Sequence, residues 1–412
     1  MLRTSRNACF WAILATSGLA CTTETEPGDG VGGSDAGAAG SGGSTTAGTG
    51  GSAGSAGTTG EDPGDAGSGL AGCGSRSISA ATVVRDSIST SQTWSGTVYV
   101  QGDVTVVDGA VLTIQPGTHV VFAADAQLEV GWNSSAATLL ANGTAAAPIT
   151  FCGEAGDPGY WKGLLIQNNV TSNSVLEHAL IADAGGVAQA LLVNAEVKVS
   201  DVHVDNSDLV GVRAGAFGES SARLSVSGTS GKAVVLTSSA ALSPFPLGGE
   251  FEGNTDNTVH LDFTDIPGLT VLHDPTIPYV LDTAVDVTEG ADLTFEAGVE
   301  VQFAADAGMD IGWNTGDVVL HVSGTAEKPV EFRGVSEEPG FWAGISIRSN
   351  VRTSSVLSHL LLRNSGGGDE GALRIEAKIQ LHDVELAQNE KGAWIGAQGL
   401  ATGATNLSIT ST

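Results

Sequence analysis

The stretch LTIQPGTHVVFAADAQLEVGWN, Leu112 to Asn133, decides the fold because it occurs twice in the chain. It returns as LTFEAGVEVQFAADAGMDIGWN, Leu293 to Asn314, so the offset is 293 − 112 = 181 residues. The same offset carries SVLEHAL, which begins at Ser174, onto SVLSHLL, which begins at Ser355. Self-similarity of this kind takes precedence over other fold signals. We therefore expect a tandem duplication of one long unit.

Charge and composition restrict the partners. The 412 residues include 17 Lys and Arg against 46 Asp and Glu, a net charge of −29. Such a field repels nucleic acid and anionic lipid, so nucleic acid is not expected as a partner and a membrane is reached only through a lipid anchor. The 58 glycines and 5% aromatic residues indicate many turns and a core of small aliphatic side chains.

Short apolar runs separated by Gly, Asn and Asp dominate the chain after the first seventy residues. Val111 to Ile114, His119 to Phe122 and Leu164 to Ile166 are examples, each of strand length. No segment shows a sustained helical period with caps. This pattern favours an all-β fold of short strands, as in a sandwich, a barrel or a solenoid.

The motifs LTIQPGT, PITF, WKGLLI and SVLEHAL, read together, resemble bacterial right-handed parallel β-helix repeat proteins. The resemblance covers about Tyr99 to Val212 and again Tyr279 to Ile395. It implies an all-β, right-handed parallel β-helix, in which each coil buries its apolar side only by stacking on its neighbours. It does not imply any particular activity.

The N-terminus resembles a bacterial lipoprotein signal. Arg3 and Arg6 precede an apolar run, Ala8 to Ala20, which ends at Cys21. The family prefers Leu three residues before the cysteine, and this chain has Gly18 there. The resemblance implies lipidation of Cys21 and an outer-membrane, lipid-anchored protein. The alternative is ordinary secretion to an extracellular location with Cys21 unmodified.

The domain organisation follows from these signals. A segment rich in Gly, Ser, Ala and Thr follows the signal and is expected to be a disordered linker. The second unit is incomplete, because its last segment, NLSITST, matches RLSVSGTS near Arg223. A bare last coil would expose a strand edge, which leaves two alternatives: a partner covers it, for example by self-association at the C-terminal edge, or the C-terminus is frayed or truncated. The expected boundaries are a signal peptide at 1–20, the linker at 21–72, a first β-helix unit at 73–277 and a second at 278–412.

Two cysteines, Cys73 and Cys152, remain for the folded part if Cys21 is lipidated. The second unit has Arg333 at the position of Cys152, so this cysteine serves the first unit only. In an oxidising compartment we expect a Cys73–Cys152 disulfide that holds the N-terminal cap to the solenoid. A metal site is the weaker alternative, since no His or Cys stands at ligand spacing beside either residue.

Two tryptophans, Trp161 and Trp342, are the candidate ligand contacts. Each follows a Pro-Gly loop that interrupts the strand pattern, and an exposed indole ring there would bind a sugar face. The alternative is that the ring packs against the end of a coil, as large aromatic side chains usually do. The same choice applies to Trp132 and Trp313 in the two GWN motifs.

A catalytic site is not evident. His178 and His359 hold the same position in both units, but no nucleophile recurs beside them, so we expect residues of the solenoid wall. Asp201 and Asp383 also recur and are expected at turns or facing solvent. No catalytic residue is therefore assigned.

The acidic loops are the remaining candidates for chemistry. A glycosidase needs two carboxyl groups at a set separation. The loop acids have no basic partner that recurs beside them; they are Glu154, Asp157, Glu337 and Glu338. No cofactor is expected, although acidic loops are compatible with weak Ca²⁺ binding.

Together these features predict a non-enzymatic cell-surface lipoprotein. Its β-helix would act as a structural, adhesive, glycan-binding or protein-binding module. The alternative is a carbohydrate-active enzyme, a polysaccharide lyase or a glycoside hydrolase, built on a β-helix.

Overall fold

The computed structural model describes residues 78–132, 136–288, 290–313, 317–396, 400–401 and 404–410. These residues fall in one compact unit, Ala66–Thr412. The predicted signal peptide, the predicted linker, Cys21 and Cys73 lie outside the described residues.

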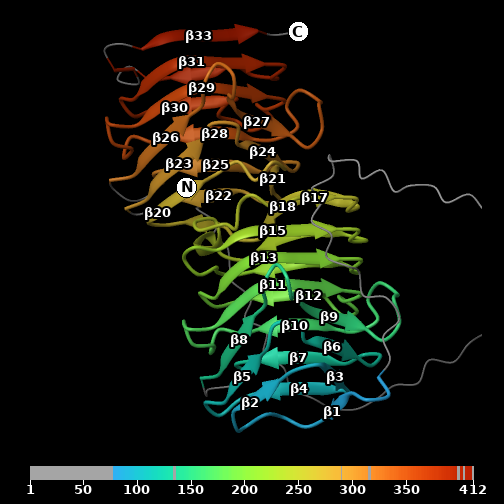
Figure 1. Ribbon diagram of the computed structural model, residues 1–412. Helices are drawn as coiled ribbons and strands as arrows, with labels where there is room; N and C mark the ends of the chain where they lie inside the picture. The colour runs from blue at the N-terminus through green and yellow to red at the C-terminus, as the bar shows by residue number, and fades with distance from the viewer. Residues whose placement is uncertain are drawn as a thin grey trace, which may run out of the picture. The chain divides into compact units, whose positions relative to one another are not determined.

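The described chain forms coils of short strands that stack on one another in three sheets of 11, 16 and 6 strands (Figure 1). Neighbouring strands within each sheet run parallel, as in the pairs β3–β6, β10–β12 and β29–β31. The helical element described is one 3₁₀ turn, η1 (Ser239–Ala241). The predicted parallel β-solenoid is confirmed.

The 11-stranded sheet belongs to the first unit. It contains β1 (Thr82–Val84), β2 (Gln92–Trp94), β3 (Thr97–Val100), β5 (Val111–Ile114), β6 (His119–Phe122), β8 (Thr138–Asn142), β9 (Ile149–Gly153), β11 (Val175–Ala182), β13 (Lys198–Asp205), β15 (Ala222–Ser227) and β17 (Phe251–Glu252).

The 16-stranded sheet runs through both units. Its first part contains β4 (Asp103–Val106), β7 (Gln127–Val130), β10 (Gly163–Ile166), β12 (Gln189–Val193), β14 (Val210–Ala214), β16 (Lys232–Leu236) and β18 (Asp256–Leu261). Its second part contains β20 (Leu269–Leu272), β21 (Tyr279–Leu281), β23 (Asp292–Glu296), β24 (Glu300–Phe303), β26 (Val319–Ser323), β27 (Val330–Gly334), β29 (Val356–Arg363), β31 (Gln380–Ala387) and β33 (Thr405–Thr410).

The 6-stranded sheet belongs to the second unit. It contains β19 (Asp265–Ile266), β22 (Val285–Val287), β25 (Gly308–Ile311), β28 (Gly344–Ile347), β30 (Leu373–Ile375) and β32 (Ala393–Ile395).

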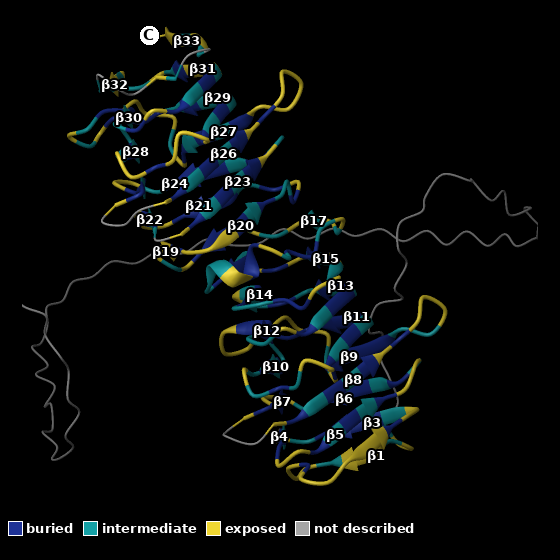
Figure 2. Ribbon diagram, turned by 90° about the vertical axis from the view of Figure 1, so that its left-hand side faces the viewer, coloured by how far each residue is buried: buried dark blue, intermediate teal, exposed yellow. Residues whose placement is uncertain are grey.

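Alternation along each strand fills the solenoid. In β5, Leu112 and Ile114 point inward and are buried, whereas Val111 and Thr113 face outward and are half-buried. Figure 2 shows buried residues along the strands and exposed residues in the turns. Four phenylalanines are buried inside the coils, namely Phe122, Phe151, Phe303 and Phe332. Because each coil shields the apolar side of the next, the core is continuous.

At the seam, where the second unit follows the first, corresponding strands are displaced by one sheet around the solenoid. We call this displacement the one-face shift. β21 corresponds to β3 in the duplication, since 279 − 181 = 98 and Val98 lies in β3. β3 belongs to the 11-stranded sheet, yet β21 continues the sheet of β4, with Val259 of β18 opposite Tyr279. The strands that follow keep this shift. Corresponding strands of the two units therefore belong to different sheets.

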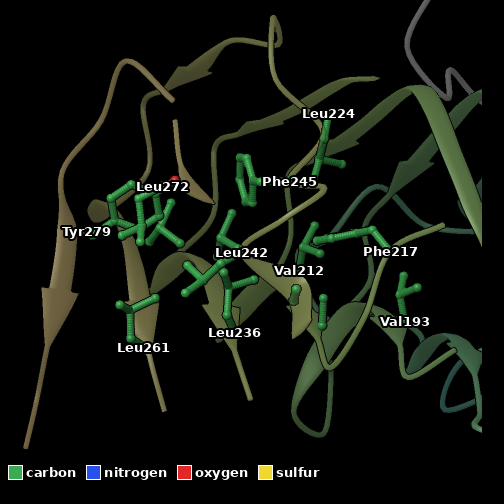
Figure 3. Close-up of a cluster of buried hydrophobic side chains, with 14 of the residues drawn as sticks. Val193, Val212, Phe217, Leu224, Leu236, Leu242, Phe245, Leu261, Leu272 and Tyr279 are labelled. Atoms are coloured by element: carbon green, nitrogen blue, oxygen red, sulfur yellow. The ribbon is translucent and has the colours of Figure 1, made fainter. Parts of the chain in front are cut away.

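The shift leaves two strands at the seam without a strand before them. β19 pairs with β22 and β20 with β23, and no other described strand pairs with either. Both strands precede residue 278 in the chain, but they pair only with strands of the second unit. Leu242 and Phe245, which follow η1, are buried and fill the core at this point (Figure 3).

Candidate functional site

The two tryptophans predicted to contact ligand, Trp161 and Trp342, are fully buried. Trp161 stacks on Phe122 at 3.8 Å between ring centroids, and Trp342 stacks on Phe303 at 3.9 Å. Each indole N–H donates to a backbone carbonyl oxygen, at 2.8 and 2.7 Å. Because each indole ring is buried against a phenylalanine and its N–H is already hydrogen-bonded, neither ring can contact a sugar. Their position corrects the prediction and matches its alternative, core packing.

The tryptophans of the GWN motifs are exposed instead. Trp132 is 56% exposed and Trp313 is 48% exposed. Each follows a strand and a glycine in the left-handed region, Gly131 at φ 79° and Gly312 at φ 83°. The glycine lets the chain leave the wall of the solenoid, so the next side chain projects outward. The duplication thus places one exposed indole at the same position in each unit.

The surroundings of Trp132 are rich in amide groups. A hollow of about 320 Å³ beside the ring is lined by Gly131, Trp132, Gln167, Asn168 and Asn169. The three polar residues follow β10 and stand one coil above the tryptophan. Their side chains both donate and accept hydrogen bonds. An aromatic face beside several amides can bind a ligand that has an apolar face and many hydroxyl groups.

A buried carboxylate holds the amide side of this hollow in place. Glu129 in β7 is only 6% exposed, and its Oε1 accepts a 2.7 Å hydrogen bond from Gln167 Nε2. Asn194 Nδ2 donates to Gln167 Oε1 at 3.3 Å. Because both ends of the Gln167 amide are engaged, its orientation is fixed, which leaves Asn168 as the exposed amide beside the ring.

The second unit has the same layout with different chemistry. Asp310 replaces Glu129 and Arg348 replaces Gln167, both at the offset of 181. Arg348 Nε lies 2.9 and 3.0 Å from the Asp310 carboxylate oxygens, and its guanidinium lies 4.9 Å from the centre of the Trp313 ring. The hydrogen bonds that Arg348 donates to Asp310 raise the pKa of Arg348 above its ordinary value. This tryptophan is therefore backed by a paired arginine.

A further exposed tryptophan extends this surface along the solenoid. Trp394 in β32 is 49% exposed, and the Arg374 guanidinium lies 4.7 Å from its ring centre. Asp310, Ser346, Arg374 and Trp394 occupy one outward column over four successive strands. Neighbouring strands stand about 4.8 Å apart, so the column spans roughly 14 Å. We call Trp313, Arg348, Arg374 and Trp394 the second platform, and Trp132 with its amide hollow the first platform.

Acidic side chains balance the arginines of the second platform. Glu370 accepts hydrogen bonds from Arg348 at 3.1 Å and from Ser346 at 2.5 Å. Burial alone would raise the pKa of Glu370, but these donors outweigh it and lower the pKa. Arg374 pairs with Glu376 at 2.7 Å. The arginines are thus held in place rather than free to pair with an anionic ligand.

Three aspartates stand on neighbouring strands beside the second platform. Asp265 pairs in register with Asp286, and Asp286 with Asp310. Burial raises the pKa of Asp286, and the charges of Asp310 and Asp265 raise it further, against a smaller opposing effect of Arg348. Asp286 is therefore flanked in register by two further carboxyl groups, one of which, Asp310, pairs with Arg348.

The recurring histidines shape the solenoid corners. β11 pairs with β8 through Val175–Glu177 and with β9 through Ala179–Ala182, and His178 between them has φ 45°. His359 has the same role at φ 49°. The His178 ring lies 3.8 Å from Asp201, which two N–H groups of Arg223 also contact at 2.5 Å. The hydrogen bonds from Arg223 lower the pKa of Asp201. The contacts among His178, Asp201 and Arg223 therefore join neighbouring coils.

The acidic loops bring no metal ligands together. Glu154 accepts a 2.6 Å hydrogen bond from the Tyr99 hydroxyl. Burial of the hydroxyl raises the pKa of Tyr99, and the hydrogen bond to Glu154 raises it further. Among the described residues no group of three or more His, Cys, Asp or Glu side chains could hold a metal ion. Weak Ca²⁺ binding stays a prediction.

Cys152 is buried in β9 and is held in a disulfide. Its predicted partner, Cys73, lies outside the described residues, so that pairing stays a prediction. Lipidation of Cys21 has the same standing, because this residue also lies outside the described part of the chain.

Sequence reasoning does not reach Arg348, Arg374 or Trp394. None has a like residue in the first unit: Gln167 lies 181 residues before Arg348, and strand pairing places Leu192 and Arg213 at the positions of Arg374 and Trp394. The strand register could identify these residues, because it shows which outward-facing side chains of successive coils are neighbours.

No protein-family model, no curated protein and no solved structure matches the chain. Within the described residues no helix is long and apolar enough to cross a membrane.

Proposed function

We propose that this chain is a non-enzymatic glycan-binding module displayed at the cell surface. The observation that carries the proposal is the pair of half-exposed tryptophans, Trp132 and Trp313, at one position of both units. A duplication that keeps a large aromatic ring exposed twice favours a contact role over packing. Lipidation of Cys21 would attach the module to the outer membrane.

The chemistry of the first platform favours a neutral sugar. One face of a pyranose is largely apolar and can cover an indole ring, while its hydroxyl groups exchange hydrogen bonds with amides. Asn168 is exposed beside Trp132, and the Glu129 carboxylate is buried beneath Gln167. No free charge therefore dominates the contact.

The second platform supports binding of a longer chain. Its tryptophans, Trp313 and Trp394, stand about three strand spacings apart, roughly 14 Å along the stacking direction. Polar side chains lie between them, including Ser346 and the paired Arg374. Two rings at the ends of a polar strip are suited to an oligosaccharide that lies along the solenoid.

A glycan-array screen of the mature chain tests the proposal. We expect binding to neutral oligosaccharides, a partial loss in Trp132→Ala and in Trp313→Ala, and complete loss in the double variant. Val187→Ala is the matched control, since Val187 is an exposed apolar residue away from both rings, 64% exposed. The proposal fails if no glycan is retained or if the double variant binds like the parent.

A second function, glycoside hydrolysis, is favoured by one observation, the pair Asp286 and Asp310. A retaining mechanism needs one protonated and one ionised carboxyl group about 5 Å apart. The two aspartates stand in register on adjacent strands; burial raises the pKa of Asp286, and Asp310 accepts a hydrogen bond from Arg348. The first unit has Thr105 in place of Asp286.

A reducing-end assay separates the two functions. If the chain is a hydrolase, turnover of the bound oligosaccharide disappears in Asp286→Thr while binding remains. Absence of turnover in the parent chain, with binding intact, supports the non-enzymatic module.

A further inference from the structure

The strand β20 presents an unpaired edge at the seam between the two units. Its one strand neighbour among the described residues is β23, where Leu269 stands opposite Asp292. The Asp292 N–H donates to the Gly268 carbonyl oxygen at 2.9 Å, which fixes the direction of the alternating backbone groups. In a parallel pair, the N–H and C=O groups of Leu269 and Val271 must then point away from β23.

This edge is a result of the one-face shift at the seam. The first unit ends its stack on a different face, so no first-unit strand lies in register with β20. The segment that passes here instead contains η1 and the buried Leu242 and Phe245, which close the core (Figure 3). They cover the apolar interior, and no described strand pairs with the side of β20 that faces away from β23.

A groove of about 520 Å³ runs beside the edge. It lies between the second unit's β20 and the loops of the first unit, and its lining includes Glu196, Glu219, Ala240, Pro244, Leu269 and Thr270. Leu269 is 76% exposed, although it begins a strand. An apolar side chain beside unpaired N–H and C=O groups is the surface that strand addition uses.

The charge of the groove selects among extended segments. Glu196 and Glu219 are both exposed at its rim, and within the described residues neither makes an ion pair. The whole chain carries a net charge of −29, which adds to the attraction of a cation and repels an acidic segment.

We propose that β20 is a docking site for an extended, basic peptide segment of a partner protein. The segment adds one parallel or antiparallel strand to β20 and forms hydrogen bonds with the backbone N–H and C=O groups of Leu269 and Val271. Its apolar side chains cover Leu269, and its lysine or arginine side chains reach Glu196 and Glu219. This site is separate from both tryptophan platforms and does not depend on glycan binding.

The probe for this site is the synthetic peptide acetyl-Lys-Val-Lys-Val-Lys-Val-amide, titrated into the isotope-labelled chain. We expect amide chemical-shift changes confined to β20 and the groove. The control peptide has Glu in place of Lys and should cause none. The proposal is overturned if the basic peptide leaves β20 unchanged at about 1 mM, near the weak end of specific binding. It is equally overturned if the peptide shifts only another strand edge.

Two variants of one position separate the backbone from the side chain. Val271→Pro removes an edge-facing N–H and not a bond to β23, a change that edge strands tolerate. It should abolish binding, whereas Val271→Ala, which retains the N–H, should bind. Unchanged binding by Val271→Pro contradicts strand addition.

A third variant covers the case in which Val271→Pro does not fold. Glu196→Gln with Glu219→Gln removes two exposed carboxylates and leaves every strand intact. We expect binding of the basic peptide to weaken by about fivefold, the effect of losing two exposed ion pairs. No weakening in this double variant overturns the charge selection.

Discussion

Asp183 is the residue where a single substitution should stabilise the protein. It is 4% exposed, and its Oδ2 has no hydrogen-bond partner among the described residues. Its Oδ1 accepts a 2.7 Å hydrogen bond from Asn206. Burial raises the pKa of Asp183 most, hydrogen bonds from Asn206 and from the Gly153 backbone oppose it, and the charge of Asp205 adds to the rise. At neutral pH the carboxylate is therefore less favourable in the folded chain than in the unfolded chain.

The second unit has an asparagine in place of Asp183, and a neutral amide does not carry the penalty of a buried carboxylate. Asn364 stands at the matching position, 364 − 181 = 183, with nearly the same backbone angle, φ 61° against 63°. Its Nδ2 donates to the carbonyl oxygen of Glu337 at 2.7 Å. In the first unit the Gly156 carbonyl oxygen, which Asn206 already contacts, can accept a second hydrogen bond. Asp183→Asn should thus satisfy the site.

The expected gain in the free energy of unfolding is about 1–2 kcal/mol at neutral pH, the cost of one buried polar atom without a partner. The penalty is full above the raised pKa of folded Asp183. It shrinks as the pH falls through that pKa and vanishes below the ordinary range of an aspartate. The advantage of Asp183→Asn should therefore be largest at neutral pH and disappear in acid.

Urea unfolding of the parent and of Asp183→Asn across this pH range measures the gain. The mirrored variant, Asn364→Asp, should lose stability at neutral pH and recover in acid. A destabilised Asp183→Asn, or a difference that does not change with pH, would refute the reasoning.

Three other outcomes follow from the packing. Trp161→Ala and Trp342→Ala should each lower the free energy of unfolding by about 3–5 kcal/mol in chemical denaturation, because each removes a fully buried, stacked ring. Arg223→Ala should reduce the acid sensitivity of unfolding by less than about 1 kcal/mol. Its partner Asp201 has a lowered pKa, so that pairing stabilises the fold above the ordinary aspartate range and is lost as the pH falls through the lowered value. Gly143→Ala should unfold the first unit or shift its thermal transition strongly, as a Cβ there would lie 2.4 Å from a carbonyl oxygen of the next coil.

The stacked strands could be predicted from the sequence because their signal is local. A short run such as Val111 to Ile114 alternates in polarity, and its copy confirms that the pattern is architectural. The one-face shift could not be predicted in this way. It depends on which strand β18 pairs with at the seam, and strand length and polarity alone do not encode that choice.

The tryptophans show why the candidate site was harder to predict. Leu128 and Val130 point inward, so simple alternation would bury Trp132 as well. Gly131 at φ 79° resets the alternation and turns the ring outward. Gly163 at φ 135° is the first residue of β10 and also interrupts the alternation, so that Trp161, two residues before it, points inward. A glycine just after a strand or at its first position thus reverses the side on which a neighbouring ring lies.

If the exposed tryptophans bind glycan as proposed, the one-face shift also decides how many of them can contact one target. Trp132 follows β7 in the 16-stranded sheet, whereas Trp313 follows β25 in the 6-stranded sheet. Avidity requires that linked sites reach the same target at once. Rings that leave different sheets cannot both lie flat on one coated surface, so the duplication gains little from repetition there. Under the proposed function, the duplication is instead suited to holding two separate glycan chains together, as a cross-link does.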